Sequence, residues 1–336
     1  MRKTLVNILK FILSLGLGVM LVWLALRNLS PQDIEKMQDA FVRTNYYWLV
    51  PGLAVGMLSN VIRAYRWRLL LNAIGYNPKI GNTIYAVMVM YLGNLVFPRL
   101  GEVSRCALLA RYENIPIQKS IGTMITERIV DVISMLLIGV YLFFAEYDVL
   151  SNFFEQTIFK SKSHSDTSML KWVIMLLGLF LAIAVWFLLK RFKSHAFVRS
   201  IIEKIEGLLE GAKSIFKLKN AWLFIFYSIM VWLCYTLMIY ICYQALVETS
   251  NASFNSALTL VFFGGIAFIA TQGGIGSYPL AVQAVLLLYG IAGVIGYTFG
   301  WIVWGVQTVL VIAVGLLSLV LISVTNKATA QSEYKQ

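Results

Sequence analysis

Long apolar runs divide this sequence, and six of them are long enough to cross a hydrocarbon core about 30 Å thick as helices. These windows lie near residues 8–26, 46–62, 126–145, 169–189, 221–246 and 297–324. Two further apolar regions are interrupted: 83–97 is short and ends at Pro98, and 256–292 is broken by the sequence TQGGIGSYP. We interpret both as re-entrant helical hairpins. The pattern therefore predicts an all-α polytopic membrane protein with about six transmembrane helices and two re-entrant hairpins.

The composition also indicates an integral membrane protein. Hydrophobic residues make up 59% of the chain and charged residues only 13%, whereas soluble domains contain roughly 25% charged residues. The formal net charge is +12, but the basic residues stand in short segments beside apolar runs and not in one long basic surface. This distribution favours anionic or modified membrane lipids as partners and argues against nucleic acid.

The positions of the basic residues predict the topology, because cytoplasmic loops collect Lys and Arg. If both interrupted regions are re-entrant, 22 of the 28 basic residues fall on the side of the two termini. The segments on that side are the N-terminus, 63–79, 98–128, 190–219 and the C-terminal tail. We therefore expect a protein of the bacterial cytoplasmic membrane with both termini in the cytoplasm.

In this topology the two hairpins enter the membrane from opposite sides, which is the arrangement that an inverted repeat produces. The segments PRLGEVSR (98–105) and GGIGSYPL (273–280) align at a constant offset that places Gly101 on Gly276. One matching glycine is weak support, so the inverted repeat depends mainly on the topology.

The chain is expected to form a single membrane domain, 1–324, with halves at about 1–145 and 169–324. A disordered cytoplasmic tail, 325–336, would follow this domain. Residues 195–219 carry apolar residues at helical spacing with charges between them. This pattern predicts an amphipathic helix that lies on the cytoplasmic membrane surface.

Charged side chains gather directly after the first interruption. Arg99, Glu102 and Arg105 are spaced by three, so one carboxylate can pair with two guanidinium groups on a helical face. An unpaired charge at the bilayer centre costs roughly 2.5–3.5 kcal/mol, so these groups must pair, reach water or meet a ligand. Two guanidinium groups against one carboxylate leave positive charge, which suits a phosphate. We interpret Arg111 and Lys119 as ordinary solvated loop charges.

The next apolar window begins with TERIVD, which supplies Glu127, Arg128 and Asp131. Glu127 and Asp131 share a helical face, and Arg128 can reach Asp131. Glu127 can also neutralise part of the preceding arginine cluster. The same residues suit an ordinary charged helix start at the membrane interface, so both interpretations stay open.

The second interruption contains a glycine turn. Its glycines expose backbone N–H groups, and a half-helix that begins near Pro279 directs its positive end inward. Both features can hold phosphate without a charged side chain, and a flexible turn that reverses the hairpin is compatible with this role. The candidate substrate-binding residues of the turn are Gln272, Gly273, Gly274 and Gly276.

Signals for catalysis or metal binding are weak. The three cysteines have no CxxC spacing, the two histidines lie far apart, and the sequence contains no HExxH, GxSxG or complete P-loop motif. We therefore expect no catalytic residues, no metal site and no cofactor.

The sequences GNLVFPRLGEVSRCALL and TERIVDVISMLL resemble the flippase-like family of integral membrane proteins that includes the membrane half of lysylphosphatidylglycerol synthase. Members show a Pro-x-Arg-x-Gly-Glu-x-x-Arg element and a downstream Glu-Arg-x-x-Asp, which fall here at Pro98 to Arg105 and at Glu127 to Asp131. The resemblance implies movement of an aminoacylated or modified phospholipid, or of a polyprenyl or glycolipid carrier, between leaflets. The acid that often follows the family's glycine turn is absent, and so is a soluble aminoacyl-transfer domain, so we expect neither proton coupling there nor synthase activity.

The sequence thus predicts a lipid transporter in which Arg99 and Arg105 bind the headgroup and Glu102 and Glu127 position them. One alternative is a membrane-embedded lipid-modifying transferase that uses Glu102 or Glu127 as a base. Another is a non-transporting partner of a lipid-synthesis or cell-envelope enzyme complex. The sequence leaves a homo-oligomer open.

Overall fold

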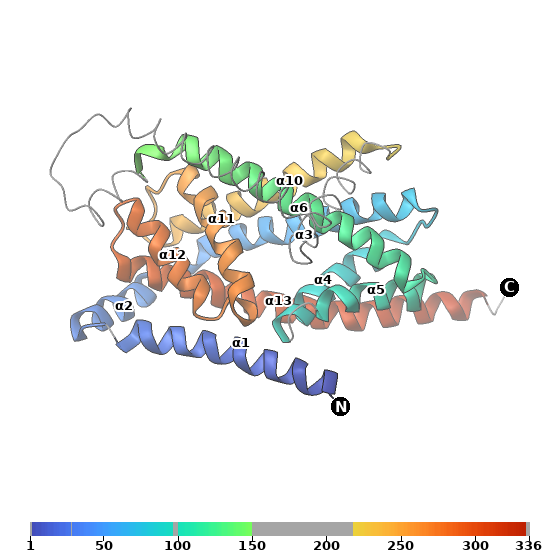
Figure 1. Cartoon of the computed structure of the whole chain (residues 1–336), viewed down its shortest axis with the longest axis horizontal. Helices are drawn as coiled ribbons and strands as arrows, with labels where there is room; N and C mark the ends of the chain where they lie inside the picture. Colours follow the sequence, from blue (N-terminus) through green and yellow to red (C-terminus); the bar gives the residue numbers. More distant parts are fainter. Residues whose placement is uncertain (1, 28, 97–99, 150–217, 334–336) are drawn as a thin grey trace, which may run out of the picture. The chain divides into compact units, whose positions relative to one another are not determined.

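The computed structural model describes residues 2–27, 29–96, 100–149 and 218–333, and all regular secondary structure in these ranges is helical. The elements, shown in Figure 1, are α1 (Arg2–Arg27), α2 (Pro31–Arg43), η1 (Tyr46–Trp48), α3 (Leu49–Ala73), α4 (Ile80–Val96), α5 (Leu100–Glu113), α6 (Ile117–Ala145), α10 (Ala221–Cys242), η3 (Tyr243–Ala245), α11 (Phe254–Ala270), η4 (Gln272–Gly274), α12 (Ser277–Leu288) and α13 (Gly293–Glu333). One compact unit consists of Met1–Leu142 and Lys219–Gln336, and the packing described below belongs to it. The predicted span 169–189 and all but the end of the predicted amphipathic helix 195–219 lie outside the described residues.

Within the described ranges, three helices are long and apolar enough to cross a membrane on their own: Ile117–Ala145, Ala221–Ala245 and Gly293–Asn326. They coincide with three of the predicted windows. The first window falls on α1, which passes the same test only together with α2, and the chain bends by 112° between them. The structure therefore supports a polytopic helical membrane protein, while the total of six spans stays a prediction.

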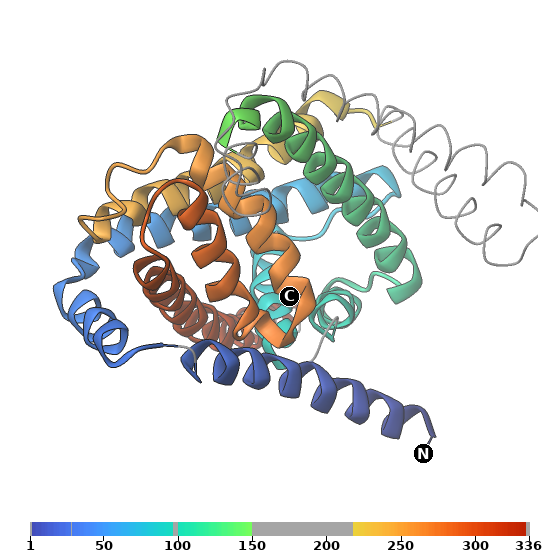
Figure 2. The same ribbon diagram turned by 60° about the vertical axis from the view of Figure 1, so that its left-hand side comes forward.

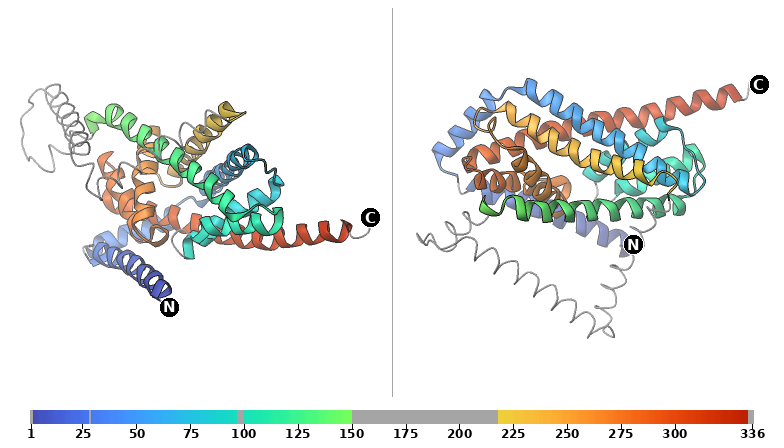
Figure 3. Two further views of the ribbon diagram at one scale, coloured as in Figure 1. Left: turned by 45° about the vertical axis from the view of Figure 1, so that its right-hand side comes forward. Right: turned by 90° about the horizontal axis from the view of Figure 1, so that it is seen from above.

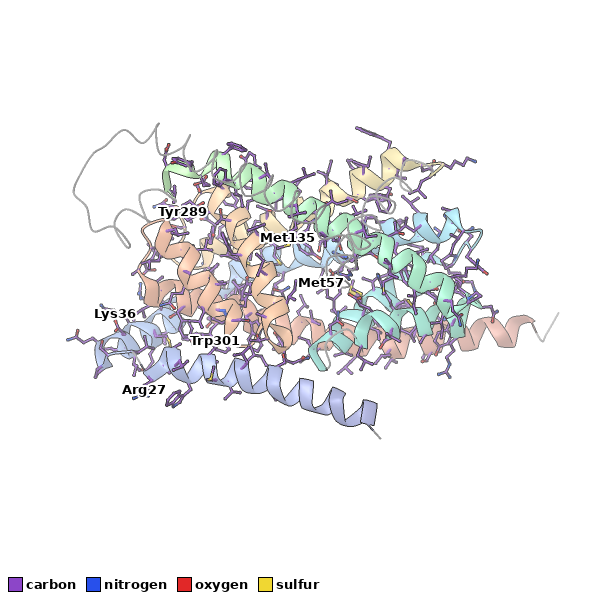
Figure 4. The ribbon with its side chains drawn as sticks, in the orientation of Figure 1. Arg27, Lys36, Met57, Met135, Tyr289 and Trp301 are labelled. Atoms are coloured by element: carbon purple, nitrogen blue, oxygen red, sulfur yellow. The ribbon has the colours of Figure 1, made fainter. Side chains whose placement is uncertain are left out.

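The bend after α1 is fixed by the start of α2. The hydroxyl of Ser30 accepts a hydrogen bond from the backbone N–H of Asp33, and the Asp33 carboxylate accepts one from the backbone N–H of Ser30, both at 3.1 Å. This reciprocal capping box stabilises a new helix start and prevents α1 from continuing. Arg27 and Lys36 lie on either side of the bend (Figure 4).

The predicted window 46–62 falls in α3, which is longer than the window. The helix continues to Ala73 and buries Arg63 and Arg66. Residues 63–73, which the charge pattern places beyond the apolar window on the side of the termini, therefore belong to the same helix. Four apolar residues of this stretch are buried beside the arginines: Ala64, Trp67, Leu70 and Leu71. Their helical spacing lets α3 pack one face inward along its whole length.

The structure contains two hairpins of short helices, α4 with α5 and α11 with α12. The second coincides with the predicted region 256–292. The predicted region 83–97 covers only α4, whereas α5 lies in the segment 98–128 that the charge pattern places on the side of the termini. These helices have 17, 14, 17 and 12 residues, fewer than the roughly 20 that a spanning helix needs. In Figure 1 the two hairpins approach each other from opposite sides. The observed lengths and directions agree with two opposed re-entrant hairpins, and re-entry into a membrane stays a prediction.

Glycines let the first hairpin close tightly. A Cβ atom on Gly93 of α4 would lie 2.8 Å from the Cα atom of Gly101 in α5, and a Cβ atom on Gly101 would overlap the carbonyl oxygen of Met90. The two backbones are therefore in direct contact. This contact positions the beginning of α5, which carries Glu102 and Arg105.

The same order of elements occurs twice along the chain. A long helix, a hairpin of two short helices and a second long helix follow one another as α3, α4–α5, α6 and again as α10, α11–α12, α13. The closing helix of each set contacts the hairpin of the other set: Gly315 of α13 packs against Leu92 of α4, and Tyr141 of α6 donates to Asn255 of α11. The opening helices α3 and α10 lie side by side (Figure 3). This is the order that the predicted inverted repeat requires.

The ends of these helices fall into two groups. In Figure 1, α3, α5 and α13 end toward the right, where α1, α6 and α10 also begin. These are the helix ends that the charge distribution places together on one side of the membrane. The side that faces the cytoplasm stays a prediction.

The second hairpin packs on α10 and α13 around an apolar core (Figure 2). Five of the buried side chains in this core are Tyr243, Leu260, Val282, Leu286 and Phe299. A Cβ atom on Gly300 of α13 would lie 2.7 Å from the Cα atom of Pro279, so α12 and α13 also make backbone contact. The core holds the glycine turn at the end of α11 in place.

Helix α13 extends beyond the predicted boundary of the membrane domain. Its backbone is helical to Glu333, whereas the sequence predicts a tail from residue 325, and the disorder of that tail stays a prediction. The side-chain amides of Asn326 and Asn82 of α4 donate to each other at 2.9 and 3.0 Å, and Asn82 also donates to Glu113 of α5. These contacts fasten α13 to the base of the first hairpin.

Candidate functional site

Three helices bring seven charged side chains together inside this apolar unit. Helix α3 contributes two of them, α5 two and α6 three: Arg63 and Arg66, Glu102 and Arg105, and Glu127, Arg128 and Asp131. We call this set the charge cluster. Its four guanidinium groups face three carboxylates, which leaves an excess of one positive charge.

Helical spacing sets the inner part of the cluster. Arg63 and Arg66 are three residues apart and Glu127 and Asp131 are four apart, so each pair lies on one helical face. Nη1 of Arg63 donates to Oε1 of Glu127 at 2.7 Å and to Oδ2 of Asp131 at 2.9 Å. Nη2 of Arg66 donates to the same Glu127 oxygen at 3.0 Å and to Oδ1 of Asp131 at 2.8 Å. Each of these two guanidinium groups therefore joins both carboxylates.

Glu127 is the centre of the cluster. Nη1 of Arg105 lies 2.9 Å from its second oxygen, so one carboxylate meets three guanidinium groups. The side chains of Glu127, Arg66 and Arg105 are fully buried. Removing one member of such a buried set leaves uncompensated charge and typically costs about 3–5 kcal/mol of stability. We therefore assign Glu127 a structural role as well as a place in the site.

Arg105 contacts an aromatic ring in addition to the carboxylate of Glu127. Its guanidinium carbon lies 4.3 Å from the centre of the Trp67 ring, and Nε1 of Trp67 donates to Oγ1 of Thr123 at 3.0 Å. Within the described part of the chain, Nε and Nη2 of Arg105 make no hydrogen bond although they are buried. Buried donors are nearly always satisfied in proteins. The cluster therefore has more hydrogen-bonding capacity than its own carboxylates use.

The pair formed by Arg128 and Glu102 differs from the inner part of the cluster. Nε of Arg128 lies 2.9 Å from Oε1 of Glu102, and the two side chains are 38% and 19% exposed. Nη1 of Arg128 is 3.7 Å from Asp131, which is only a loose contact. This outer pair is the part of the cluster that a molecule from outside can reach.

Tyrosines tie the cluster to the first hairpin and to the second half of the chain. The hydroxyls of Tyr91 in α4 and Tyr235 in α10 are 3.0 Å apart, and Nη2 of Arg63 donates to the Tyr235 hydroxyl at 3.5 Å. Nη1 of Arg66 donates to the hydroxyl of Ser228 in α10 at 3.3 Å. These hydrogen bonds connect the cluster directly to α10.

The glycine turn of the second hairpin contacts the end of α4. The buried Gln272 donates from Nε2 to the carbonyl oxygens of Asn94 and Leu95 at 3.1 and 2.8 Å. These are carbonyls that the end of a helix leaves without partners, so Gln272 acts as a cap supplied by the other hairpin. Nε1 of Trp304 in α13 donates to the carbonyl of Gly273 at 2.8 Å. Trp301, one turn earlier on α13, lies near the same hairpin in Figure 4.

The turn has the backbone conformation that the glycines predict. Gly273, Gly274 and Gly276 have φ values of +60°, +76° and +74°, which side chains with a Cβ atom rarely adopt. Helix α12 then begins at Ser277, close to the predicted start at Pro279. The hydroxyls of Thr271 and Ser277 lie 2.6 Å apart and close the loop.

The predicted site residues separate into groups in the structure. Five of them converge in the charge cluster: Glu102, Arg105, Glu127, Arg128 and Asp131. The four residues of the glycine turn lie at the tip of the other hairpin, where Gln272 contacts α4 and not the charged side chains. Arg99 lies outside the described residues.

The expected pair of Glu102 with Arg105 is not formed, and the expected pair of Glu102 with Arg99 lies outside the described residues. Arg105 pairs with Glu127 and Glu102 pairs with Arg128, because both residues reach across to α6 and not along their own helix. The predicted contact between Arg128 and Asp131 is present as the loose 3.7 Å approach. The expectation that Glu127 neutralises part of the arginine cluster is confirmed through Arg105.

The sequence patterns do not predict the contribution of α3. They place Arg63 and Arg66 in the segment 63–79, beyond the apolar window 46–62 and on the side of the two termini. Their burial could have been inferred from their spacing of three and from neighbouring large apolar residues such as Trp67, because this spacing places both arginines on one apolar helical face. The tyrosine pair, Tyr91 and Tyr235, had no signal that distinguishes it from other tyrosines in apolar segments.

Comparison with known proteins gives further information. A family model described as the lysylphosphatidylglycerol synthase TM region matches residues 9–315. The chain is 23% identical over 145 residues to the UPF0104 membrane protein of Methanocaldococcus jannaschii, covering 42% of this chain and 40% of that protein. It is 34% identical over 80 residues to the glycosyltransferase AglD of Haloferax volcanii, covering 24% of this chain and 13% of that protein. The alignments thus span less than half of either relative. No solved structure matches the chain.

Proposed function

The chain belongs to the family of the lysylphosphatidylglycerol synthase transmembrane region, and we propose that it moves a phosphate-bearing lipid between the two leaflets of its membrane. The observation that carries this proposal is the charge cluster, in which four guanidinium groups face three carboxylates among apolar helices. Guanidinium groups match the geometry of phosphate oxygens, and an excess of positive charge favours an anionic group. The candidate cargo is an aminoacylated or otherwise modified phospholipid, or a polyprenyl or glycolipid carrier.

The arrangement of the helices supports a transport mechanism. Transporters built from inverted repeats place the substrate site where their broken helices meet and expose it alternately to each side. Here the end of α4 meets the glycine turn through Gln272, and α4 also carries Tyr91, which contacts Tyr235 beside the cluster. Rocking of the two halves would change these contacts and the access to the cluster together.

A lipid-modifying transferase is the alternative from another class. It would need Glu102 or Glu127 as a base, yet Glu127 meets three guanidinium groups and Glu102 is paired with Arg128. Both carboxylates are therefore already engaged in ion pairs. We therefore propose a transporter without a catalytic step, and consumption of the lipid would contradict this proposal.

The test is leaflet exchange by the purified full chain in vesicles. Fluorescent analogues of anionic and zwitterionic phospholipids and of a polyprenyl phosphate are followed by quenching of the outer leaflet. We expect at least one lipid to move faster than in protein-free vesicles and to be recovered chemically unchanged. The Arg105→Lys variant keeps the charge but loses the planar fork, and we expect it to slow exchange by about tenfold, equivalent to about 1.4 kcal/mol.

The matched control is Arg111→Gln, because Arg111 is an exposed arginine on the same helix. Thermal unfolding in detergent is measured for each variant, so that a loss of stability is separated from a loss of transport. Equal rates for protein-containing and protein-free vesicles across all these lipids, with and without ion gradients, would contradict the proposal.

A further inference from the structure

The outer pair of the charge cluster is built differently from the inner part. Every inner guanidinium group approaches Glu127, and the side chains of Arg63, Arg66 and Arg105 are at most 6% exposed. Arg128, in contrast, is 38% exposed, and its partner Glu102 is 19% exposed. Nε of Arg128 lies close to Glu102 but lacks hydrogen-bond geometry within the described part of the chain. The outer pair is therefore the most accessible ion pair of the cluster, and it shares its lack of hydrogen-bond geometry with the buried pair of Arg105 and Glu127.

Apolar side chains surround the outer pair on the outside of the unit. Ile125 and Val132 stand three residues before and four residues after Arg128 on α6, and they are 51% and 45% exposed. Val103, which follows Glu102 on α5, is 50% exposed. Residues at these helical spacings share the face of Arg128. An ion pair bordered by exposed apolar side chains suits a molecule that has a charged head and hydrocarbon tails.

The two charges of the outer pair restrict which lipid headgroup can bind there. An anionic head that took Arg128 would displace the Glu102 carboxylate and leave it without a cation beside an apolar surface, which is costly. A head that also carries an ammonium group would give the displaced carboxylate a new partner. Arg128 and Glu102 then each have a new partner of opposite charge, and the net charge of the site does not change.

We propose that the outer pair is an exchangeable headgroup site for zwitterionic phospholipids with a primary ammonium group. The lipid phosphodiester takes the place of Glu102 on Arg128, and the lipid ammonium donates to the released Glu102 carboxylate. This inference rests on the proposed function and adds the class of headgroup and the residues that select it. Because the lipid carries one negative and one positive charge, its transport moves no net charge across the membrane and is electroneutral.

The experiment uses the full chain in phosphatidylcholine vesicles. Phosphatidylethanolamine and phosphatidylglycerol with the same fluorescent acyl chain are compared for leaflet exchange, and lipid retention in the native mass spectrum measures binding separately. We expect a preference for phosphatidylethanolamine of about tenfold, the ratio that one additional hydrogen bond to a charged group gives at the lower end of its usual range. The rate should not change when a potassium gradient with valinomycin imposes a membrane potential.

Variants test the role of each partner. Glu102→Gln removes the carboxylate that receives the ammonium, so the preference should fall to about one, whereas Glu102→Asp should keep part of it. Arg128→Gln should weaken both lipids, and Arg111→Gln should change neither. A preference that persists in Glu102→Gln, a preference for phosphatidylglycerol in the unaltered protein, or a rate that follows the membrane potential would overturn the inference. Selective binding without leaflet exchange would support the headgroup site and contradict the proposed transport function.

Discussion

The two hairpins have the same architecture but satisfy their polar groups in different ways. The α4–α5 hairpin carries Glu102 and Arg105 and is tied to its neighbours by ion pairs. The described residues of the α11–α12 hairpin contain no charged side chain, and its tip is closed by glycines, hydroxyls and the amide of Gln272. Since charges inside an apolar environment are costly, their restriction to one hairpin is consistent with the proposed headgroup site at the charge cluster. In the proposed transport cycle, the other hairpin moves against it.

The largest effect is expected from the centre of the charge cluster. Glu127→Gln leaves three guanidinium groups facing a neutral amide, so stability in detergent should fall by about 3–5 kcal/mol. The measurement is the denaturation midpoint of the purified protein. The matched control is Glu248→Gln, whose partner Arg43 lies at the surface; an exposed pair of this kind contributes about 0–1 kcal/mol. Equal midpoints for the two variants would contradict the central role of Glu127.

A second prediction concerns the backbone contact within the first hairpin. A Cβ atom in Gly101→Ala overlaps the Met90 carbonyl, so α4 and α5 must separate. We expect a loss of about 1–3 kcal/mol, the usual effect of overpacking. Gly122→Ala is the control, because a Cβ atom on Gly122 meets no atom within 4 Å. If Gly101→Ala melts at the temperature of the unaltered protein, the hairpin geometry described above is wrong.

A third prediction tests the cap that the second hairpin supplies to the first. Gln272→Met keeps a similar volume but removes both hydrogen bonds to Asn94 and Leu95. We expect a loss of about 1–3 kcal/mol and faster amide hydrogen exchange near the end of α4, because two buried acceptors lose their donor. Exchange that accelerates only in α11 and α12 would show that Gln272 does not couple the hairpins.

The smallest effect is expected at the tyrosine pair. Tyr235→Phe removes one hydroxyl that contacts Tyr91 and Arg63 but leaves the ion pairs intact. The expected loss is about 1 kcal/mol, the contribution of a typical hydrogen bond. A loss as large as that of Glu127→Gln would show that the tyrosines, and not the carboxylate, hold the cluster together.

Sequence patterns predicted the helical class, the two interruptions and five of the residues that converge, because apolar length and local charge spacing determine these features. They did not predict the partners. Glu102 and Arg105 can pair along α5, and only the packing of α5 against α6 shows that they pair elsewhere. The place of Arg63 and Arg66 in the charge cluster was not predicted, because basic residues after an apolar window usually mark a loop. Long-range contacts such as that of Gln272 with α4 have no local signature.

The most direct test is a structure determined in nanodiscs that contain phosphatidylethanolamine. The central claim is that the charge cluster binds a lipid headgroup at Arg128 of α6 and Glu102 of α5. We predict headgroup density within hydrogen-bonding distance of Arg128, with the Glu102 carboxylate released from it and facing the ammonium end. Headgroup density at the glycine turn of the second hairpin, with the pair between Arg128 and Glu102 intact, would contradict the account.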